Sequence, residues 1–145
     1  MGRVAGHIWN LPNTIVGGAW ALANRAFGGE FSIQNGAIVL ENAPLQPEGS
    51  AITLGDVVVF GGRASDVFPP QAPYTIGQHE FAHLPQGRVL GPLYLPANVV
   101  GWTASLAHFA ARGFSAQGWL SPVHGPLNFM ERGPLSTPPR ATPWR

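Results

Sequence analysis

Two tight-turn signals, each set between apolar runs, constrain the fold of this chain more than any other feature of its sequence. In EFSIQNGAIVLE, residues 30–41, apolar and polar residues alternate on either side of Asn35-Gly36. Asn-Gly between two such runs favours a two-residue hairpin turn, because both residues tolerate positive φ angles. AITLGDVVVF, residues 51–60, predicts a third strand or a second tight hairpin about its Gly-Asp pair. We therefore expect a small, mostly antiparallel sheet.

Apolar residues at helical spacing predict two longer helices around this sheet. The first occupies residues 15–27, with Asn13 or Thr14 as its N-cap and the glycine pair after it as its stop. The second occupies residues 99–112, with Asn98 as its N-cap and Gly113 as its stop. The residues expected to face the core are Ile15, Val16, Ala19, Trp20, Ala23 and Phe27 in the first helix, and Val99, Trp102, Leu106 and Phe109 in the second.

Prolines and glycines mark the connections between these elements. Residues 63–73, RASDVFPPQAP, predict a loop that ends the sheet. Pro126 and Gly133 frame a short helix, and a proline-rich tail after it is expected to pack through Trp144. The whole chain, residues 1–145, is thus predicted to be one α+β domain, with residues 131–145 including the tail.

The composition excludes several classes of protein. Charged residues make up 10% of the chain and its net charge is +1, so it lacks the basic surface that binds nucleic acid. Cysteine is absent, which removes disulfides and thiolate metal sites. No apolar run approaches the ~20 residues of a membrane span, and the run at 15–23 is too diluted by glycine to make a convincing signal peptide. We expect a monomer.

Residues 79–83, HEFAH, match the pattern H-E-x-x-H. Histidines four apart on a helix can both offer a ring nitrogen to one tetrahedral Zn²⁺, while Glu80 faces the water bound to the metal and accepts its proton. The pattern arises by chance on the order of once per hundred chains of this composition. Thr75 and Gln78 have the spacing of a capping box, which predicts a helix that begins near Ile76 and carries both histidines.

Pro85 lies two residues after the second histidine of this pattern. Proline lacks the N–H that would bond to the carbonyl of Phe81, and inside a helix this costs ~3 kcal/mol. We expect the helix to kink beyond His83, so that His79 and His83 keep their positions relative to each other.

A catalytic zinc normally has three protein ligands, so one more must come from elsewhere in the chain. His124 and Glu131 stand out because they lie in a segment, bounded by glycine and proline, that can fold back over the motif. We choose Glu131 as the ligand and His124 as a group beside the site or a donor to an oxyanion; a structural role in a loop is the alternative for His124. Tyr94 is a second candidate donor. We expect His108 to be packed or on the surface, and Glu41, Glu48 and Asp66 to be solvated. The remaining histidines and acids are His7, Glu30 and Asp56.

Four segments resemble a family of small bacterial domains found at the C-terminal end of polymorphic toxins and of VgrG spike proteins of the type VI secretion system. They read HIWNLPNT, AITLGDVVVFGG, QHEFAHLPQGRVLGPLYLPANVVG and HGPLNFMERGP, followed by PPR, and they span His7 to Arg140. The resemblance implies a minimal zincin-like metallopeptidase fold. It also implies a zinc metallopeptidase effector that is delivered into the periplasm of a rival cell, with a protein or peptide substrate and a cognate immunity protein as partners.

Carried over to this sequence, the family pattern makes His79 and His83 zinc ligands, Glu80 the general base and Glu131 the third ligand. Glu131 lies in an N-x-x-E-R-G-P element from Asn128 to Pro134. The chain departs from the pattern at Leu84-Pro85, where Thr and a bulky residue are expected, and this places the helix geometry in question.

Two rival functions remain open from the sequence. In a binding or structural module, zinc would only stabilise the fold, and a fourth ligand such as His124 would close the site. In an inactive relative of a peptidase, Pro85 would have disturbed the helix that carries the ligands.

Overall fold

A computed structural model describes residues 3–67, 74–113 and 124–132 of the chain. Its four-stranded sheet comprises β1 (Glu30–Gln34), β2 (Ala37–Glu41), β3 (Ala51–Leu54) and β4 (Val57–Phe60), in the order β1-β2-β4-β3. β1 pairs antiparallel with β2, so the predicted hairpin at Asn35-Gly36 is confirmed. β3 pairs antiparallel with β4, so of the two alternatives for residues 51–60 the structure has the second hairpin. Asn35 and Gly36 have φ angles of 51° and 72°, as a hairpin turn with two left-handed residues requires. β2 and β4 join the two hairpins by parallel pairing.

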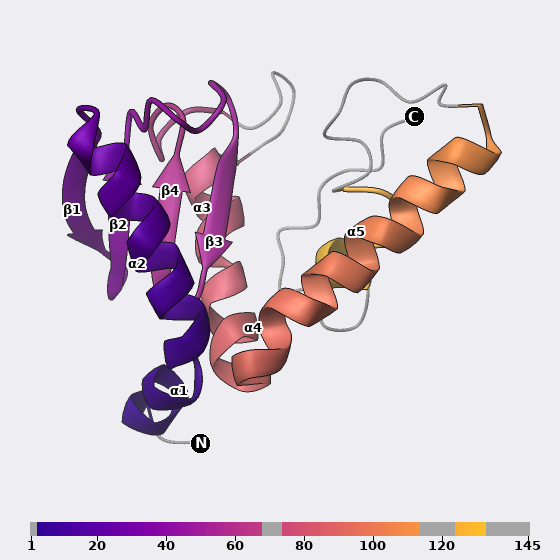
Figure 1. Cartoon of the computed structure of the whole chain (residues 1–145), viewed down its shortest axis with the longest axis horizontal. Helices are drawn as coiled ribbons and strands as arrows, with labels where there is room; N and C mark the ends of the chain where they lie inside the picture. Colours follow the sequence, from indigo (N-terminus) through magenta and orange to yellow (C-terminus); the bar gives the residue numbers. More distant parts are fainter. Residues whose placement is uncertain (1–2, 68–73, 114–123, 133–145) are drawn as a thin grey trace.

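β4 lies inside the sheet, and this explains why VVVF is apolar throughout instead of alternating. All four of its residues are at most 1% exposed. Val57 and Val59 pack with Leu40 and Ala21 on the face covered by α2 (Leu11–Ala26). Val58 and Phe60 pack on the other face with residues of α3 (Ile76–Phe81) and α4 (His83–Leu90). A strand covered on both faces needs an apolar side chain at every position, and the molecule is accordingly layered as helix, sheet, helix (Figure 1).

α1 (Arg3–Trp9) and α2 follow each other with only Asn10 between them, and α2 faces the sheet with small and amide residues. The expected cap of this helix is wrong, and so is most of its expected core face, although the half-buried Trp20 does pack against the core. Asn13 and Thr14 lie inside α2, and Ile15 and Phe27 are 64% and 68% exposed. Gly17 shows why, since a Cβ there would overlap the carbonyl oxygen of Leu54 and lie 2.8 Å from Cβ of Val57. The helix approaches the sheet too closely for large side chains. The buried residues of α2 are Asn13, Gly17, Ala21 and Asn24.

α5 (Tyr94–Ala111) follows a short 3₁₀ turn, η1 (Gly91–Leu93), and runs obliquely away from the sheet (Figure 1). The predicted N-cap is wrong, because Asn98 lies inside the helix and its side-chain amide donates to the carbonyl of Tyr94 at 2.9 Å. The predicted core face is also wrong, since Val99 and Trp102 are 61% and 42% exposed. The buried residues are Tyr94, Gly101 and Ser105. Gly113, with a φ of 76°, does follow the end of the helix as expected.

The last described helix, α7 (Phe129–Arg132), begins three residues after Pro126, which lies in the preceding turn. Gly133 and Trp144, expected as the stop of this helix and the anchor of the tail, lie outside the described residues. Across the described ranges, no helix combines the length and the apolar character that crossing a bilayer requires.

Candidate metal centre

The start of α3 is fixed by the predicted capping box. The hydroxyl oxygen of Thr75 accepts from the backbone N–H of Gln78 at 3.1 Å, and the N–H of Thr75 donates to the side-chain oxygen of Gln78 at 2.9 Å. The next two N–H groups, of Ile76 and Gly77, donate to carbonyls of the preceding loop at 2.8 Å. With these donors satisfied, the first turn of α3 is held firmly, and so is the direction in which His79 projects.

H-E-x-x-H spans two short helices, so the expectation of one helix that kinks beyond His83 is wrong. α3 ends at Phe81 and α4 begins at His83. Pro85 accounts for the position of the break, because its missing N–H and its ring interrupt the helical bond to the carbonyl of Phe81. As the third residue of α4, Pro85 occupies a position whose N–H has no partner within a helix. Ala82, between the two helices, keeps helical angles of −68° and −20°, so the histidines still project to one side.

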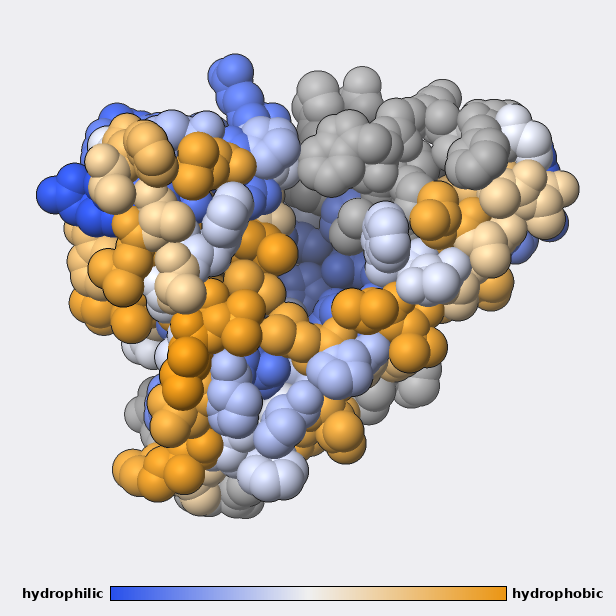
Figure 2. Space-filling view, in the orientation of Figure 1, coloured by the Kyte–Doolittle hydropathy of each residue, from blue (hydrophilic) through white to orange (hydrophobic). Residues whose placement is uncertain are grey.

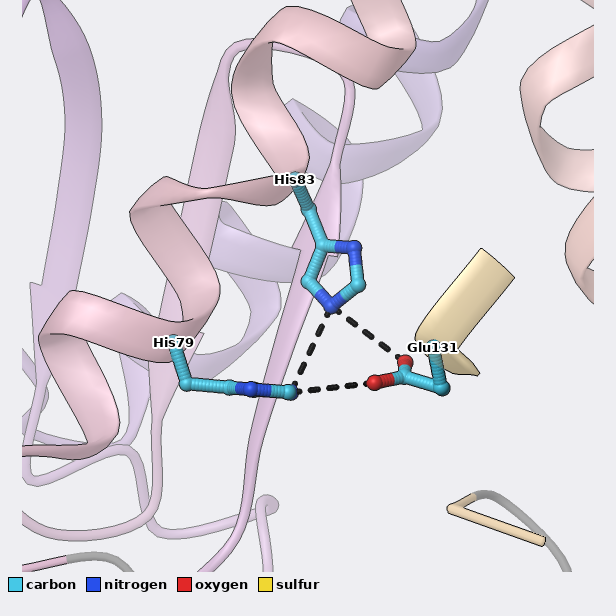
Figure 3. Close-up of side chains that lie close together, drawn as sticks. All are labelled: His79, His83 and Glu131. Atoms are coloured by element: carbon cyan, nitrogen blue, oxygen red, sulfur yellow. Dashed lines mark hydrogen bonds and ion pairs between the residues drawn. The ribbon is translucent and has the colours of Figure 1, made fainter. Parts of the chain in front are cut away.

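The two histidines meet Glu131 in a buried cluster (Figure 3). Nε2 of His79 lies 3.3 Å from one carboxylate oxygen of Glu131, and Nε2 of His83 lies 3.3 Å from the other. The two Nε2 atoms are 3.4 Å apart. Ligand atoms about 2.0–2.2 Å from a tetrahedral ion are about 3.3–3.5 Å from one another, so this spacing fits a zinc-sized ion. Among the described residues, these three form a group that could hold a metal.

Glu131 reaches the histidines because α7 is anchored on α5. Asn128 precedes α7, and its side-chain oxygen accepts from the N–H of Met130 at 3.1 Å. The side chain of Asn128 rests against Gly101 of α5, where a Cβ would overlap its oxygen. Met130 is fully buried and Glu131 is 8% exposed. The short helix thus presents its carboxylate toward α3 and α4.

Gln86 connects the two halves of the cluster, and the sequence analysis missed it. Its side-chain oxygen lies 2.6 Å from Nδ1 of His83, and its side-chain nitrogen donates to the carbonyl of Met130 at 2.9 Å. Because the amide nitrogen serves Met130, the amide oxygen faces His83 and accepts from Nδ1–H. Nε2 of His83 then offers its lone pair to a metal. The available signal was a polar residue three positions after His83, on the same helical face.

His124 lies beside Glu131, with its Nδ1 3.3 Å from a carboxylate oxygen. Its ring centroid is 5.2 Å from that of His79, and its side chain is buried. The segment that carries His124 and Glu131 does fold back over the motif. Its helix, α7, begins at Phe129 and not at Pro126 as expected.

Glu80 lies against β3 and lines a cavity together with His83 and Glu131. Its carboxylate accepts a hydrogen bond of 2.6 Å from the hydroxyl of Thr53. The hydroxyl of Tyr94 donates to the carbonyl of the same Thr53 at 3.3 Å. Thr53 was also missed from the sequence, because a threonine in a strand gives no signal of a contact with a helix 27 residues away in the sequence.

Burial and charge shift three pKa values in this cluster. Burial lowers the pKa of His83, but the hydrogen bond and charge of Glu131, with the charge of Glu80 and the hydrogen bond of Gln86, outweigh it and raise the pKa from 6.5 to about 9. Burial raises the pKa of Glu131, but hydrogen bonds with His124, His79 and His83 hold it well below 4.5. For Tyr94, burial and the charges of Glu80 and Glu131 hold the pKa well above 10.

A cavity of about 480 Å³ opens beside the cluster, between β3 and α5. It is lined by Glu80, His83 and Glu131, by Tyr94 and Trp102 of α5, and along its length by β3. A hollow is visible between the sheet and α5 in Figure 2. A larger and shallower hollow of about 710 Å³, along residues 42–48 and 61–66, contains none of the cluster.

The other histidines and acids lie elsewhere. Nδ1 of His7 and the guanidinium of Arg88 both bond to Asp56 at 2.8 Å, behind the cluster. Glu41 is not simply solvated as expected, since its half-buried carboxylate accepts from the N–H of Ala64 at 2.7 Å. His108 lies on α5 with its ring against Phe109.

Comparison of the chain with protein-family models, with curated proteins and with solved structures found no match in any of the three.

Proposed function

We propose that this chain is a zinc-dependent peptidase in which His79, His83 and Glu131 hold the metal and Glu80 acts as general base. The observation that carries the proposal is the spacing of the three ligand atoms, 3.3–3.4 Å apart, at the wall of a cavity that Glu80 also lines. Three protein ligands beside an open cavity leave a position for water and substrate, as catalytic zinc sites do.

In this proposal, zinc at the site supplies polarisation of the scissile carbonyl and lowers the pKa of coordinated water to about 7. Glu80 accepts the proton of the attacking water and returns it to the nitrogen of the leaving amine as the C–N bond breaks. The hydroxyl of Thr53 holds the Glu80 carboxylate at 2.6 Å in one orientation. His124 and Tyr94 are the candidate donors to the oxyanion; Tyr94 suits this role because its high pKa keeps it protonated.

The substrate in this proposal is an extended peptide, either in a protein or in a peptidoglycan cross-link. β3 is the terminal strand of the sheet, and its residues line the cavity. A strand edge without a partner strand can pair with a peptide backbone, which aligns an amide bond beside the metal cluster. From the resemblance of its sequence segments, we extend the proposal to an antibacterial effector, active in the periplasm of a target cell and neutralised by an immunity protein.

The first experiment compares the native chain with Glu80→Gln, which preserves side-chain size but removes the base. We expect one zinc per chain in both, measured by plasma mass spectrometry, and a loss of peptide hydrolysis of at least about a hundredfold in the variant. Glu30→Gln, at an exposed acid on β1, the edge strand opposite β3, is the matched control and should retain full activity. Full activity of Glu80→Gln would refute the base assignment, and absence of zinc from the native chain would refute the whole proposal.

The effector role is tested by a separate experiment in cells. Native chain exported to the periplasm should stop growth, and the Glu80→Gln variant should not.

A second candidate function, a binding module with a closed zinc site, is favoured by the position of His124. Its Nδ1, 3.3 Å from Glu131, is near enough for His124 to become a fourth ligand after a small rotation. Zinc titration of two variants decides between the functions. In the peptidase, Glu131→Gln weakens zinc binding by more than about a hundredfold and His124→Ala by about tenfold or less. The reverse order would make His124 the ligand and would favour the closed site.

A further inference from the structure

α1 and α2 place their apolar residues on the wrong side for a helix of an ordinary soluble domain. The residues they bury against the rest of the molecule are Gly6, Asn10, Asn13, Gly17, Ala21 and Asn24. From Val4 to Leu22, by contrast, every exposed residue is apolar. The large apolar side chains that are at least half exposed follow one another at intervals of four, three, four and seven residues, which is the spacing of one helical stripe. We call this the outer stripe: Val4, Ile8, Leu11, Ile15 and Leu22, which are 50–72% exposed.

The inner face of α2 does not need apolar side chains because amide groups make its contacts. The side-chain nitrogen of Asn13 donates to the carbonyl of Gly91 at 2.6 Å. The side-chain oxygen of Asn24 accepts from the N–H of Leu45 at 2.8 Å. With small residues and hydrogen-bonded amides inside, the outer stripe contributes little to the folding of the domain itself.

η1 and α5 repeat the same inverted pattern. α5 buries Tyr94, Gly101 and Ser105, whereas Leu93, Val99 and Val100 are 60–63% exposed. η1 contacts α1, α2 and α5, and so connects the two groups of helices. Figure 2 shows apolar residues gathered over α1, α2 and α5 on one face of the molecule.

Acidic residues are absent from the two sequence segments that carry these apolar surfaces. Residues 1–29 contain no acid and two arginines, Arg3 and Arg25; residues 81–130 contain no acid and two arginines, Arg88 and Arg112. The seven acids of the chain all lie outside these two segments, at Glu30, Glu41, Glu48, Asp56, Asp66, Glu80 and Glu131. On α2 the exposed charged residue is therefore a cation, Arg25, whereas Arg88 is already paired with Asp56.

We propose that the outer stripe, together with the exposed apolar residues of η1 and α5, binds the boundary between headgroups and acyl chains of an anionic lipid bilayer. Surface helices of soluble domains turn their apolar side inward, and large exposed apolar patches mark partner or membrane surfaces. A protein partner would call for hydrogen-bonding groups around the apolar residues. From Val4 to Leu22 the exposed residues are apolar, and the side chain of His7, which is 42% exposed, is already bonded to Asp56. Anionic headgroups match the exposed Arg25 and the absence of acids from both segments. Because α2 packs on the sheet through its other side, it lies along the membrane plane and does not cross it.

The test is flotation of the full chain with vesicles of phosphatidylcholine, alone or mixed with phosphatidylglycerol. We expect the native chain to float with the mixed vesicles and more weakly with the neutral ones. Ile8→Glu and Ile15→Glu should each lower the vesicle partition coefficient by at least about tenfold. Arg25→Gln should lower binding to mixed vesicles several-fold and leave binding to neutral vesicles unchanged.

Val67→Glu is the matched control, since Val67 is apolar and 58% exposed but lies in the loop before α3. Circular dichroism and thermal unfolding verify that each variant is folded, which is expected because all these side chains are exposed. The proposal is overturned if the native chain binds neither type of vesicle, or if Val67→Glu loses as much binding as Ile15→Glu. It is equally overturned if the native chain self-associates, Ile15→Glu makes it monomeric, and neither binds vesicles.

Discussion

Gln86 contacts the candidate metal site without being one of its candidate ligands. Its amide fixes the tautomer of His83 and, through the carbonyl of Met130, the position of the helix that carries Glu131. Groups that orient metal ligands in this way typically contribute 10–100-fold in metal affinity.

Substitution at Gln86 should separate these two tasks. Gln86→Leu removes both hydrogen bonds, so we expect zinc affinity to fall by 10–100-fold in a competition titration with a chromogenic chelator. Gln86→Glu keeps an acceptor for His83 and loses only the donor to Met130, so it should retain more affinity than Gln86→Leu. Equal affinities of the two variants would contradict the role in fixing the His83 tautomer.

The metal-free protein should lose stability as the solution becomes alkaline. The pKa of His83 is raised from 6.5 to about 9 in the fold, so its protonated form stabilises the native state fully below pH 6.5, and this contribution disappears as the pH rises toward 9. The pKa of Glu131 is lowered, so its contribution is present above pH 4.5 and is lost in acid. We expect the free energy of unfolding in EDTA to fall by about 2–3 kcal/mol between pH 6.5 and 9.

Urea unfolding at several pH values measures this decline, and His83→Gln is its control. The variant lacks the titrating ring and should show a smaller pH dependence over the same range. A native curve that is flat from pH 6.5 to 9 would contradict the ion pairing of His83 with Glu131.

At the scale of elements, two adjacent glycines of α2 have opposite surroundings. A Cβ at Gly17 would collide with the β3–β4 turn, whereas one at Gly18 would meet nothing within 4 Å. We expect Gly17→Ala to lower the free energy of unfolding by at least about 2 kcal/mol through overpacking. Gly18→Ala should raise it by about 0.5–1 kcal/mol, because alanine favours the helix. Urea unfolding of the pair measures both, and equal effects would show that α2 does not pack on the sheet through Gly17.

The elements that could be predicted from the sequence are those determined by neighbouring residues. Asn35-Gly36 determines its own hairpin, and Thr75 with Gln78 determines the start of α3, because each uses contacts within a few residues. The break at Ala82 was misplaced although its cause, Pro85, was identified, because a proline interrupts the bond to the carbonyl four residues earlier. The break therefore falls before His83 and not beyond it.

The orientation of α2 and α5 could not be predicted from periodicity. Periodic apolar residues identify one face of a helix, and burial of that face is then assumed. In this chain the close approach required by Gly17 and Gly101 turns the opposite faces inward. The approach of Glu131 to the motif was expected on chemical grounds, but the anchoring of α7 through Asn128 and Gln86 depends on contacts between distant segments that no local pattern encodes.

At the scale of the whole molecule, a metal at the cluster would join segments that are far apart in the chain. His79 and His83 belong to helices packed on the sheet, whereas Glu131 belongs to a four-residue helix held by α5. Without the ion, Glu131 holds α7 against α4 through its contact with His83, and the raised pKa of His83 keeps that ring protonated near neutral pH. The contact of α7 with α4 therefore depends on pH.

Because Glu131 lies on α7, bound zinc should slow the local unfolding of α7 more than that of any other described element. We expect the amides of Met130 and Glu131 to exchange with deuterium at least about tenfold faster in EDTA than with zinc bound, while those of β4 change little. Exchange followed by mass spectrometry, with Glu131→Gln as control, measures the difference; equal rates with and without zinc would contradict it. The amide exchange rate of α7 would then report how much of the protein has metal bound, and this measurement needs no knowledge of the substrate.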